Sequence, residues 1–129
     1  MNIQRYFDIA KKIASRSNHH KYRLGCVIVK GKVVIGMGWN MKKTHPRSPH
    51  PYCHVHAEFM AIMSAGQDRE LLEGSTCYVY RESKTGYLAM AKPCPSCMGM
   101  LKSYGIKVVS YTTQGSYETQ EICLLSNKI

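Results

Sequence analysis

Two β-branched apolar runs, at residues 24–29 and 32–39, stand on either side of a short turn centred on Gly31. Such runs separated by a glycine-containing turn predict an antiparallel hairpin. Helix and strand patterns then alternate: a helix at 57–66, a strand at 75–82, a helix at 95–105 and a strand at 106–113. With an amphipathic helix at 3–17, this order predicts an α/β chain with a mainly parallel region after the hairpin and helices on both faces of the sheet.

The length of 129 residues predicts a single domain spanning 1–129 around one core. No apolar run reaches bilayer length, so we expect no membrane among the partners. Residues 1–16 are studded with charges and lack the apolar core of a signal peptide. We therefore expect a cytoplasmic protein, or one of the host cytoplasm if the chain is virus-encoded, whose six cysteines are thiols or metal ligands.

The chain is strongly basic, with 18 Lys and Arg residues against 8 Asp and Glu residues and a formal charge of +10. An excess of this size favours phosphate-bearing partners, from free nucleotides to nucleic acid. The basic residues are spread along the chain, so a soluble basic surface explains the charge equally well. Charge therefore narrows the class of partner only weakly.

Two short motifs carry metal-ligand chemistry. Cys94 and Cys97 form a C-x-x-C pair at the predicted start of a helix, where the helix dipole and free N–H groups stabilise thiolates. His56 begins the other helix and supplies a third ligand, and a catalytic zinc keeps three protein ligands and one open position. Glu58 is placed to carry protons rather than to bind the metal. Because the sheet order brings both helix starts to the same strand ends, we expect one catalytic Zn²⁺ there.

Other metal arrangements use the same residue types. Cys53 and His56 with the C-x-x-C pair also spell a closed Cys₃His structural site, although that reading leaves Glu58 unexplained. Cys26 and Cys53 with nearby histidines form a less favoured second site. Cys26 and Cys77 fall in strand patterns and are most simply buried small apolar residues.

The order H-x-E followed by P-C-x-x-C is the signature of zinc nucleobase deaminases. At these residues the chain resembles the cytidine and deoxycytidylate deaminase superfamily. The resemblance extends over roughly residues 24–113 and includes "LGCVIVKGKVVIGMGWN", "HAEFMAI", "GSTCYVY", "KPCPSC" and "GIKVVSYTT", in the family's order. It implies a three-layer α/β/α fold whose central mixed sheet of about five strands opens with an antiparallel hairpin.

The resemblance also implies roles for single residues. Zinc would activate a water for attack on C4 of cytosine or C6 of adenine, and Glu58 would carry its proton. Asn40 would hydrogen-bond the sugar, or else cap a turn. The main chain of Ala57 would read the base edge, and the N–H of Cys94 would help to hold the developing oxyanion. Trp39 either lines the pocket or belongs to the core.

A basic loop follows the hairpin and contains Lys42, Lys43, His45 and Arg47. These residues are placed to meet a phosphate, although a solvated loop is the competing interpretation. The "CHVHAE" segment is similar to the Cys-x-x-HAE pattern of deoxycytidylate deaminases, so dCMP is the preferred substrate. The loop departs from the longer, Gly-rich form of those enzymes.

Two alternatives remain open. The first is an enzyme that deaminates cytosine in single-stranded DNA or adenosine in tRNA, which the basic charge permits. "GMGWN" resembles tRNA adenosine deaminases, although Lys-Pro-Cys replaces their Glu-Pro-Cys. The second is a non-catalytic, zinc-stabilised module that binds nucleic acid. Self-association into a homo-oligomer is expected from the resemblance alone.

Overall fold

A computed structural model describes residues 3–18, 22–41 and 56–122 of the chain. The elements, in chain order, are α1 (Ile3–Ala14), β1 (Tyr22–Lys30), β2 (Val33–Trp39), α2 (Ala57–Ser64), α3 (Arg69–Leu72), β3 (Thr76–Ser83), α4 (Pro95–Ser103), β4 (Val108–Thr112) and β5 (Tyr117–Glu121). Gly31 forms the turn between β1 and β2 with a φ of 64°, a left-handed conformation that glycine adopts without strain. The predicted hairpin is thus confirmed.

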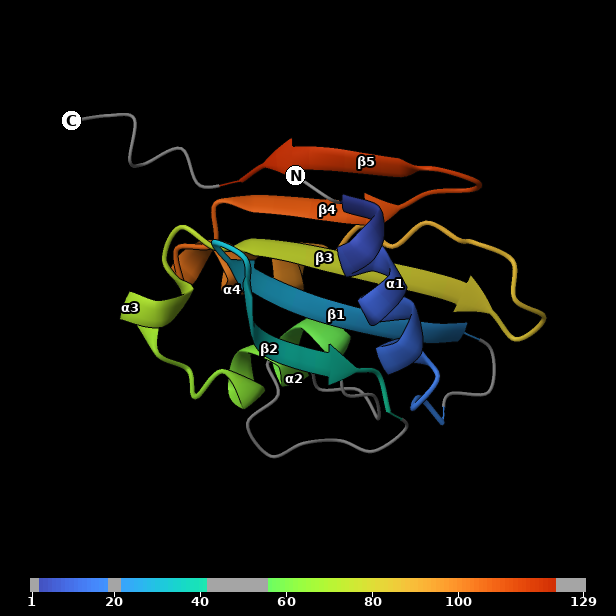
Figure 1. Cartoon of the computed structure of the whole chain (residues 1–129), viewed down its shortest axis with the longest axis horizontal. Helices are drawn as coiled ribbons and strands as arrows, with labels where there is room; N and C mark the ends of the chain where they lie inside the picture. Colours follow the sequence, from blue (N-terminus) through green and yellow to red (C-terminus); the bar gives the residue numbers. More distant parts are fainter. Residues whose placement is uncertain (1–2, 19–21, 42–55, 123–129) are drawn as a thin grey trace.

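The five strands form one mixed sheet in the order β2-β1-β3-β4-β5 (Figure 1). β1 is antiparallel to both β2 and β3, and β4 is antiparallel to β5. Only β3 and β4 form a parallel pair among the described strands. The two strands expected after the hairpin, β3 and β4, are therefore parallel as predicted, and the antiparallel neighbours on either side of them make the sheet mixed, as the family resemblance implies. β2, β3 and β4 do run in one direction, as their helical crossovers require, but β1 lies between β2 and β3 and separates them.

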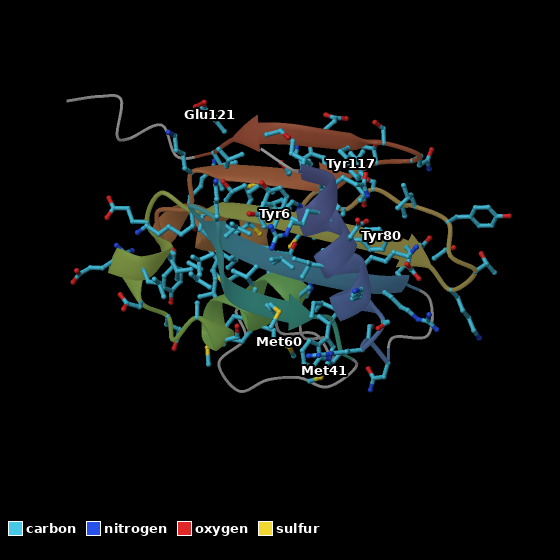
Figure 2. All side chains as sticks on the ribbon, viewed as in Figure 1. Tyr6, Met41, Met60, Tyr80, Tyr117 and Glu121 are labelled. Carbon is cyan, nitrogen blue, oxygen red and sulfur yellow. The ribbon has the colours of Figure 1, made fainter. Side chains whose placement is uncertain are left out.

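Helices cover both faces of the sheet, so the expected three-layer arrangement is confirmed. Helix α1 packs on one face, which Figure 1 shows in front, whereas α2 and α4 cover the other. Figure 2 labels Tyr6, Tyr80 and Tyr117, which belong to the hydrophobic cluster on the α1 face. The cluster on the opposite face contains Cys26 and Cys77, both fully buried as the sequence predicts.

Strand β2 lies very close to helix α2 because it carries glycine where the two elements meet. A Cβ atom added to Gly38 would collide with the backbone O of Ala57 and the backbone N of Ala61. Backbone atoms cannot move aside as a flexible side chain does, so a side chain at this position would push the helix away. The glycine therefore fixes the start of α2 against the sheet.

Three parts of the fold differ from the sequence expectation. Helix α1 ends at Ala14, before the predicted end at residue 17. The short helix α3 was not expected; it is capped by the carboxylate of Asp68, which accepts from the N–H groups of Glu70 and Leu71. The segment after Gly115, where the sequence pattern is ambiguous, forms strand β5. Within residues 3–18, 22–41 and 56–122, no helix has the length and apolar character of a membrane span.

Candidate metal centre

His56 and Cys94 occupy equivalent places on two helices. His56 is the residue that precedes α2, and Cys94 precedes α4; each has an extended backbone and a side chain that makes no capping hydrogen bond. Pro95 follows Cys94 in the first position of α4, where its missing N–H has no intrahelical acceptor to lose. Neither side chain caps its own helix, and both project from the helix starts.

The three predicted ligands come together between these helix starts. Nδ1 of His56 lies 3.4 Å from Sγ of Cys97 and 3.9 Å from Sγ of Cys94. All three ligand atoms lie within 4.8 Å of one another. Zn–N bonds of about 2.0–2.1 Å and Zn–S bonds of about 2.3 Å place tetrahedral N and S ligands about 3.6 Å apart, which falls between the two measured distances. The cluster therefore suits a single zinc ion.

Burial makes the Cys97 thiol a poor acid without a metal. Its side chain is fully buried, and desolvation, followed by the charges of Glu58 and Cys94, raises the pKa of Cys97 well above its ordinary value. A zinc ion binds the thiolate form and displaces the thiol proton. Metal binding at this cluster is therefore coupled to proton release.

Glu58 lies in the first turn of α2 and is only 2% exposed. Burial raises the pKa of its carboxyl to about 7, against weaker opposing effects from its own backbone N–H and from the charge of Arg81. Its Oε1 atom is buried and has no hydrogen-bond partner among the described residues. A buried carboxyl oxygen without a partner beside two thiols and an imidazole fits a site that receives a metal ion and a polar ligand.

The segment between β3 and α4 positions Cys94 and was not foreseen from the sequence. After β3 the chain turns back, and the N–H of Ala89 donates to the O of Arg81. Buried Thr112 holds this segment from β4: its hydroxyl donates to the O of Ala89 and accepts from the N–H of Arg81, while its own O accepts from Ala91. These bonds continue the sheet after the β3–β4 ladder ends.

Asn40 is buried at the end of β2, and its side chain is already engaged with β1. Oδ1 accepts from the N–H of Leu24 at 2.9 Å, and Nδ2 donates to the O of Tyr22 at 3.1 Å. One N–H and one lone pair of the amide remain for another group. The structure thus gives Asn40 a place in the strand pairing, while a contact with a sugar stays a prediction.

Ala57 and Trp39 lie on opposite sides of the sheet. Ala57 is the first residue of α2 and is fully buried. Its backbone lies between His56 and Glu58 in the chain. Trp39 packs with the hydrophobic cluster on the α1 face, and the guanidinium of Arg16 lies 5.3 Å from the centre of its ring. The structure thus shows Trp39 packed against this cluster, while a contact of Trp39 with the substrate stays a prediction.

Several residues singled out from the sequence fall outside the described part of the chain. They are Lys42, Lys43, His45, Arg47, Cys53 and His54. The suggested phosphate contacts, the closed Cys₃His site and the second metal site depend on them and stay predictions. Within the described ranges, His56, Cys94 and Cys97 are the one group of three potential metal ligands.

Comparison with known proteins gives a consistent result. The family model of the cytidine and deoxycytidylate deaminase zinc-binding region matches residues 1–113. The chain is 32% identical to a deoxycytidylate deaminase of Mycobacterium phage D29, over 82% of this chain and 90% of that protein. It is 28% identical to the deoxycytidylate deaminase of Schizosaccharomyces pombe, over 93% of this chain but only 39% of the relative. The chain thus spans about two fifths of the length of that yeast relative.

Solved structures agree on the fold. The dCMP deaminase of cyanophage S-TIM5 superposes with a TM-score of 0.62 over 84% of this chain and 80% of that chain, at 22% identity. RibD of Acinetobacter baumannii superposes with a TM-score of 0.54 over 85% of this chain and 28% of that chain, at 29% identity. The five-stranded sheet with its flanking helices is common to these structures and to this chain.

Proposed function

Because this chain belongs to the cytidine and deoxycytidylate deaminase family, we propose that it hydrolyses the exocyclic amino group of a cytosine nucleotide. The preferred substrate is dCMP, which with one water gives dUMP and ammonia. The observation that carries this proposal is the convergence of His56, Cys94 and Cys97 beside a buried carboxyl with an unpaired oxygen.

His56, Cys94 and Cys97 are the residues that would hold the zinc ion. When bound, zinc supplies a Lewis acid that makes water a nucleophile at neutral pH. The three side chains come from two helix starts that are fixed to the sheet, so their arrangement is set before substrate binds. Preorganised groups of this kind need little rearrangement in the transition state.

Glu58 carries the protons of the reaction. Its carboxylate takes a proton from the attacking water, delivers it to N3 of the base and assists the amino group to leave as ammonia. A group transfers protons in both directions most effectively when its pKa is near the working pH, and burial brings the pKa of Glu58 to about 7. The unpaired Oε1 atom is available for these transfers.

The backbone around the ligands completes the site. The N–H groups at the start of a helix have no intrahelical acceptor, so those of Ala57 and Cys94 are placed to bind a base edge and a developing oxyanion. Asn40 keeps one N–H and one lone pair for the sugar. These assignments follow the family resemblance and are proposals for this chain.

The relatives support dCMP but do not exclude other pyrimidine nucleotides. Three deoxycytidylate deaminases match the chain at 28–32% identity. A diaminohydroxyphosphoribosylamino-pyrimidine deaminase of Buchnera aphidicola is 36% identical over 67% of this chain. The names of both kinds of relative describe an amino-substituted pyrimidine attached to a sugar phosphate. Deamination of a nucleic acid is the alternative that the charge of +10 permits.

A substrate panel tests the proposal directly. The zinc-loaded chain is incubated with deoxycytidine, dCMP, dCTP, CMP, AMP and a cytosine-containing single-stranded oligonucleotide, and released ammonia is measured. We expect the highest kcat/KM with dCMP. Turnover of the oligonucleotide without turnover of dCMP would favour the nucleic-acid enzyme. Zinc binding without any ammonia release would favour the non-catalytic module.

A further inference from the structure

Arg81 lies near the end of β3 on the face of the sheet that carries the metal centre. Along β3 it alternates with Val79 and Cys77, whose side chains pack in the cluster beneath α2 and α4. In the β1–β3 register it stands opposite Leu24, which packs against the same cluster. A charged arginine on a strand face whose other residues are apolar does not fit the pattern of a buried face. Residues that break such a pattern are expected at functional sites.

The Arg81 guanidinium is held in one orientation. Its central carbon lies 3.9 Å from the centre of the Tyr22 ring, which is a stacked geometry that suits a planar guanidinium. Nη1 donates to the O of Met90 at 3.0 Å. The contacts come from β1 and from the segment that leads to Cys94. The head group is therefore fixed before any ligand arrives.

One edge of this guanidinium has no hydrogen-bond partner among the residues that the structure describes. Nε is buried and has no hydrogen-bond partner among the described residues. Because Nη1 is bonded to Met90, the Nε–H and Nη2–H groups on the other edge remain as a parallel pair of donors. Two parallel N–H groups match the oxygen spacing of a carboxylate or a phosphate, and such charge-assisted bidentate pairs are strong. A buried N–H without an acceptor also calls for an explanation.

The chain offers no evident carboxylate for this edge. All eight Asp and Glu residues lie within the described ranges. The one ion pair among the described side chains joins Arg23 to Glu82, not Arg81 to an acid. The charge of Arg81 lowers the pKa of Glu58, but the two side chains form no ion pair. An anion brought in from outside is therefore the fitting partner.

We propose that the Nε–H and Nη2–H groups of Arg81 bind the 5′-phosphate of the nucleotide substrate. Arg81 shares its end of the sheet with Asn40, since Leu24 stands opposite Arg81 and donates to Asn40. A nucleotide whose base reaches the metal centre and whose sugar meets Asn40 then extends its phosphate along this end. This inference rests on the proposed function, which supplies a nucleotide as the ligand.

The competing explanation is that Arg81 only anchors residues 87–91 through the Met90 carbonyl. That role would affect every substrate equally, because it acts through the position of Cys94. A phosphate contact affects only phosphorylated substrates. The comparison of dCMP with deoxycytidine, which differ in the phosphate alone, separates the two explanations.

Three variants provide the test in the zinc-loaded full chain. Arg81→Met keeps an unbranched stem against Tyr22 and removes the charge, whereas Arg81→Lys keeps the charge and removes the paired donors. Arg23→Met is the matched control, because Arg23 alternates to the α1 face of the sheet and pairs with Glu82. Zinc content and melting temperature are measured for each variant, so that a folding defect is recognised.

For Arg81→Met we expect kcat/KM for dCMP to fall roughly 10–100-fold, mainly through KM, as for loss of a hydrogen bond to a charged group. Arg81→Lys should recover part of this loss. Activity on deoxycytidine should change less than about threefold, and Arg23→Met should change neither. An equal loss on both substrates, or an unchanged KM for dCMP, overturns the inference.

Direct binding separates this inference from the proposed function. Calorimetric titration of the zinc-loaded wild type and of Arg81→Met with the products dUMP and deoxyuridine, which differ in the phosphate alone, involves no turnover. Tighter binding of dUMP than of deoxyuridine, lost in Arg81→Met, supports the phosphate contact even if no ammonia is released from dCMP. Equal affinity of the wild type for both ligands, or unchanged discrimination in Arg81→Met, overturns the contact whether or not dCMP is deaminated.

Discussion

Nδ1 of His56 and Sγ of Cys97 lie 3.4 Å apart although 41 residues separate them in the chain. The distance is set by two helices that begin at the same end of the sheet, one after β2 and one after β3. The metal centre is therefore a property of the sheet topology.

The ligand assignment is tested by metal content. Cys94→Ser and Cys97→Ser each remove one sulfur from the cluster, and we expect both variants to lose the single zinc that the wild type holds. Cys77→Ala is the control, because Cys77 is buried in β3 and is not one of the three clustered ligands. Atomic emission measurements on dialysed protein give the stoichiometry. A Cys97→Ser protein that keeps a full zinc equivalent contradicts the assignment.

The role of Glu58 is tested by Glu58→Gln, which keeps the shape of the side chain and removes its proton-transfer chemistry. We expect zinc content to be unchanged and kcat to fall roughly 10²–10⁴-fold, the usual contribution of a positioned acid–base group. Ammonia release from dCMP is the measurement, and Glu121→Gln on exposed β5 is the control. Near-normal turnover in Glu58→Gln would show that another group moves the protons.

Burial of Glu58 also has a consequence for the stability of the metal-free protein. The pKa is about 7 in the folded chain against an ordinary value of 4.5, so between these pH values the folded state binds more protons than the unfolded state. The free energy of unfolding therefore falls as pH rises from 4.5 to 7, by at most about 3 kcal/mol from this group.

Glu58→Gln removes this pH dependence. Urea unfolding of chelated protein should show the variant gaining stability relative to the wild type from pH 4.5 to 7, with no further gain above pH 7. The difference between the two proteins isolates Glu58 from the other titrating groups. A difference that is constant across this pH range, or one that shrinks as pH rises, contradicts the raised pKa.

The close contact between β2 and α2 is tested by Gly38→Ala. The added methyl group meets backbone atoms of Ala57 and Ala61, so we expect destabilisation of about 1–3 kcal/mol together with weaker zinc binding. Gly99→Ala is the matched control, because nothing lies within 4 Å of a Cβ at that helical position. The control should gain about 0.5–1 kcal/mol. Urea unfolding and competition with a zinc chelator measure the two effects.

The bridge made by Thr112 is tested by Thr112→Val, which keeps the branched shape and removes the hydroxyl. The O of Ala89 and the N–H of Arg81 both lose a partner, so we expect a loss of about 1–3 kcal/mol. Thr113→Val is the control, because the neighbouring hydroxyl makes no hydrogen bond within the described residues. Equal stability of the two variants would contradict the bridging role of Thr112.

Local sequence signals predicted the parts of the fold that depend on local chemistry. The turn at Gly31, the helix starts at His56 and Cys94, and the meeting of these starts all follow from turn chemistry and ligand spacing. The pairing of β1 with β3 could not be read in this way. It joins segments such as those around Cys26 and Cys77, which lie 51 residues apart, and no local pattern specifies a pairing across that distance.

The remaining differences have similar causes. Strand β5 contains residues that are mostly exposed, so the alternation of apolar and polar residues that marks a strand is weak there. The sequence shows that the charged Arg81 lies on the same strand face as Cys77 and Val79, which are buried. It does not show which N–H groups of Arg81 remain unbonded, because that depends on the position of the Met90 carbonyl. The metal ligands could be predicted because few residue types bind zinc. The role of an arginine could not, because arginine side chains form ion pairs, stack on aromatic rings and bind anions in many different settings.

The insertion of β1 between β2 and β3 makes β1 the strand that joins the two halves of the metal centre. His56 begins the helix after β2, and both sulfurs lie at the start of the helix after β3. The imidazole and the thiols are thus held in register through the hydrogen bonds that β1 makes on its two edges. Damage to β1 would therefore weaken zinc binding even though this strand contributes no ligand.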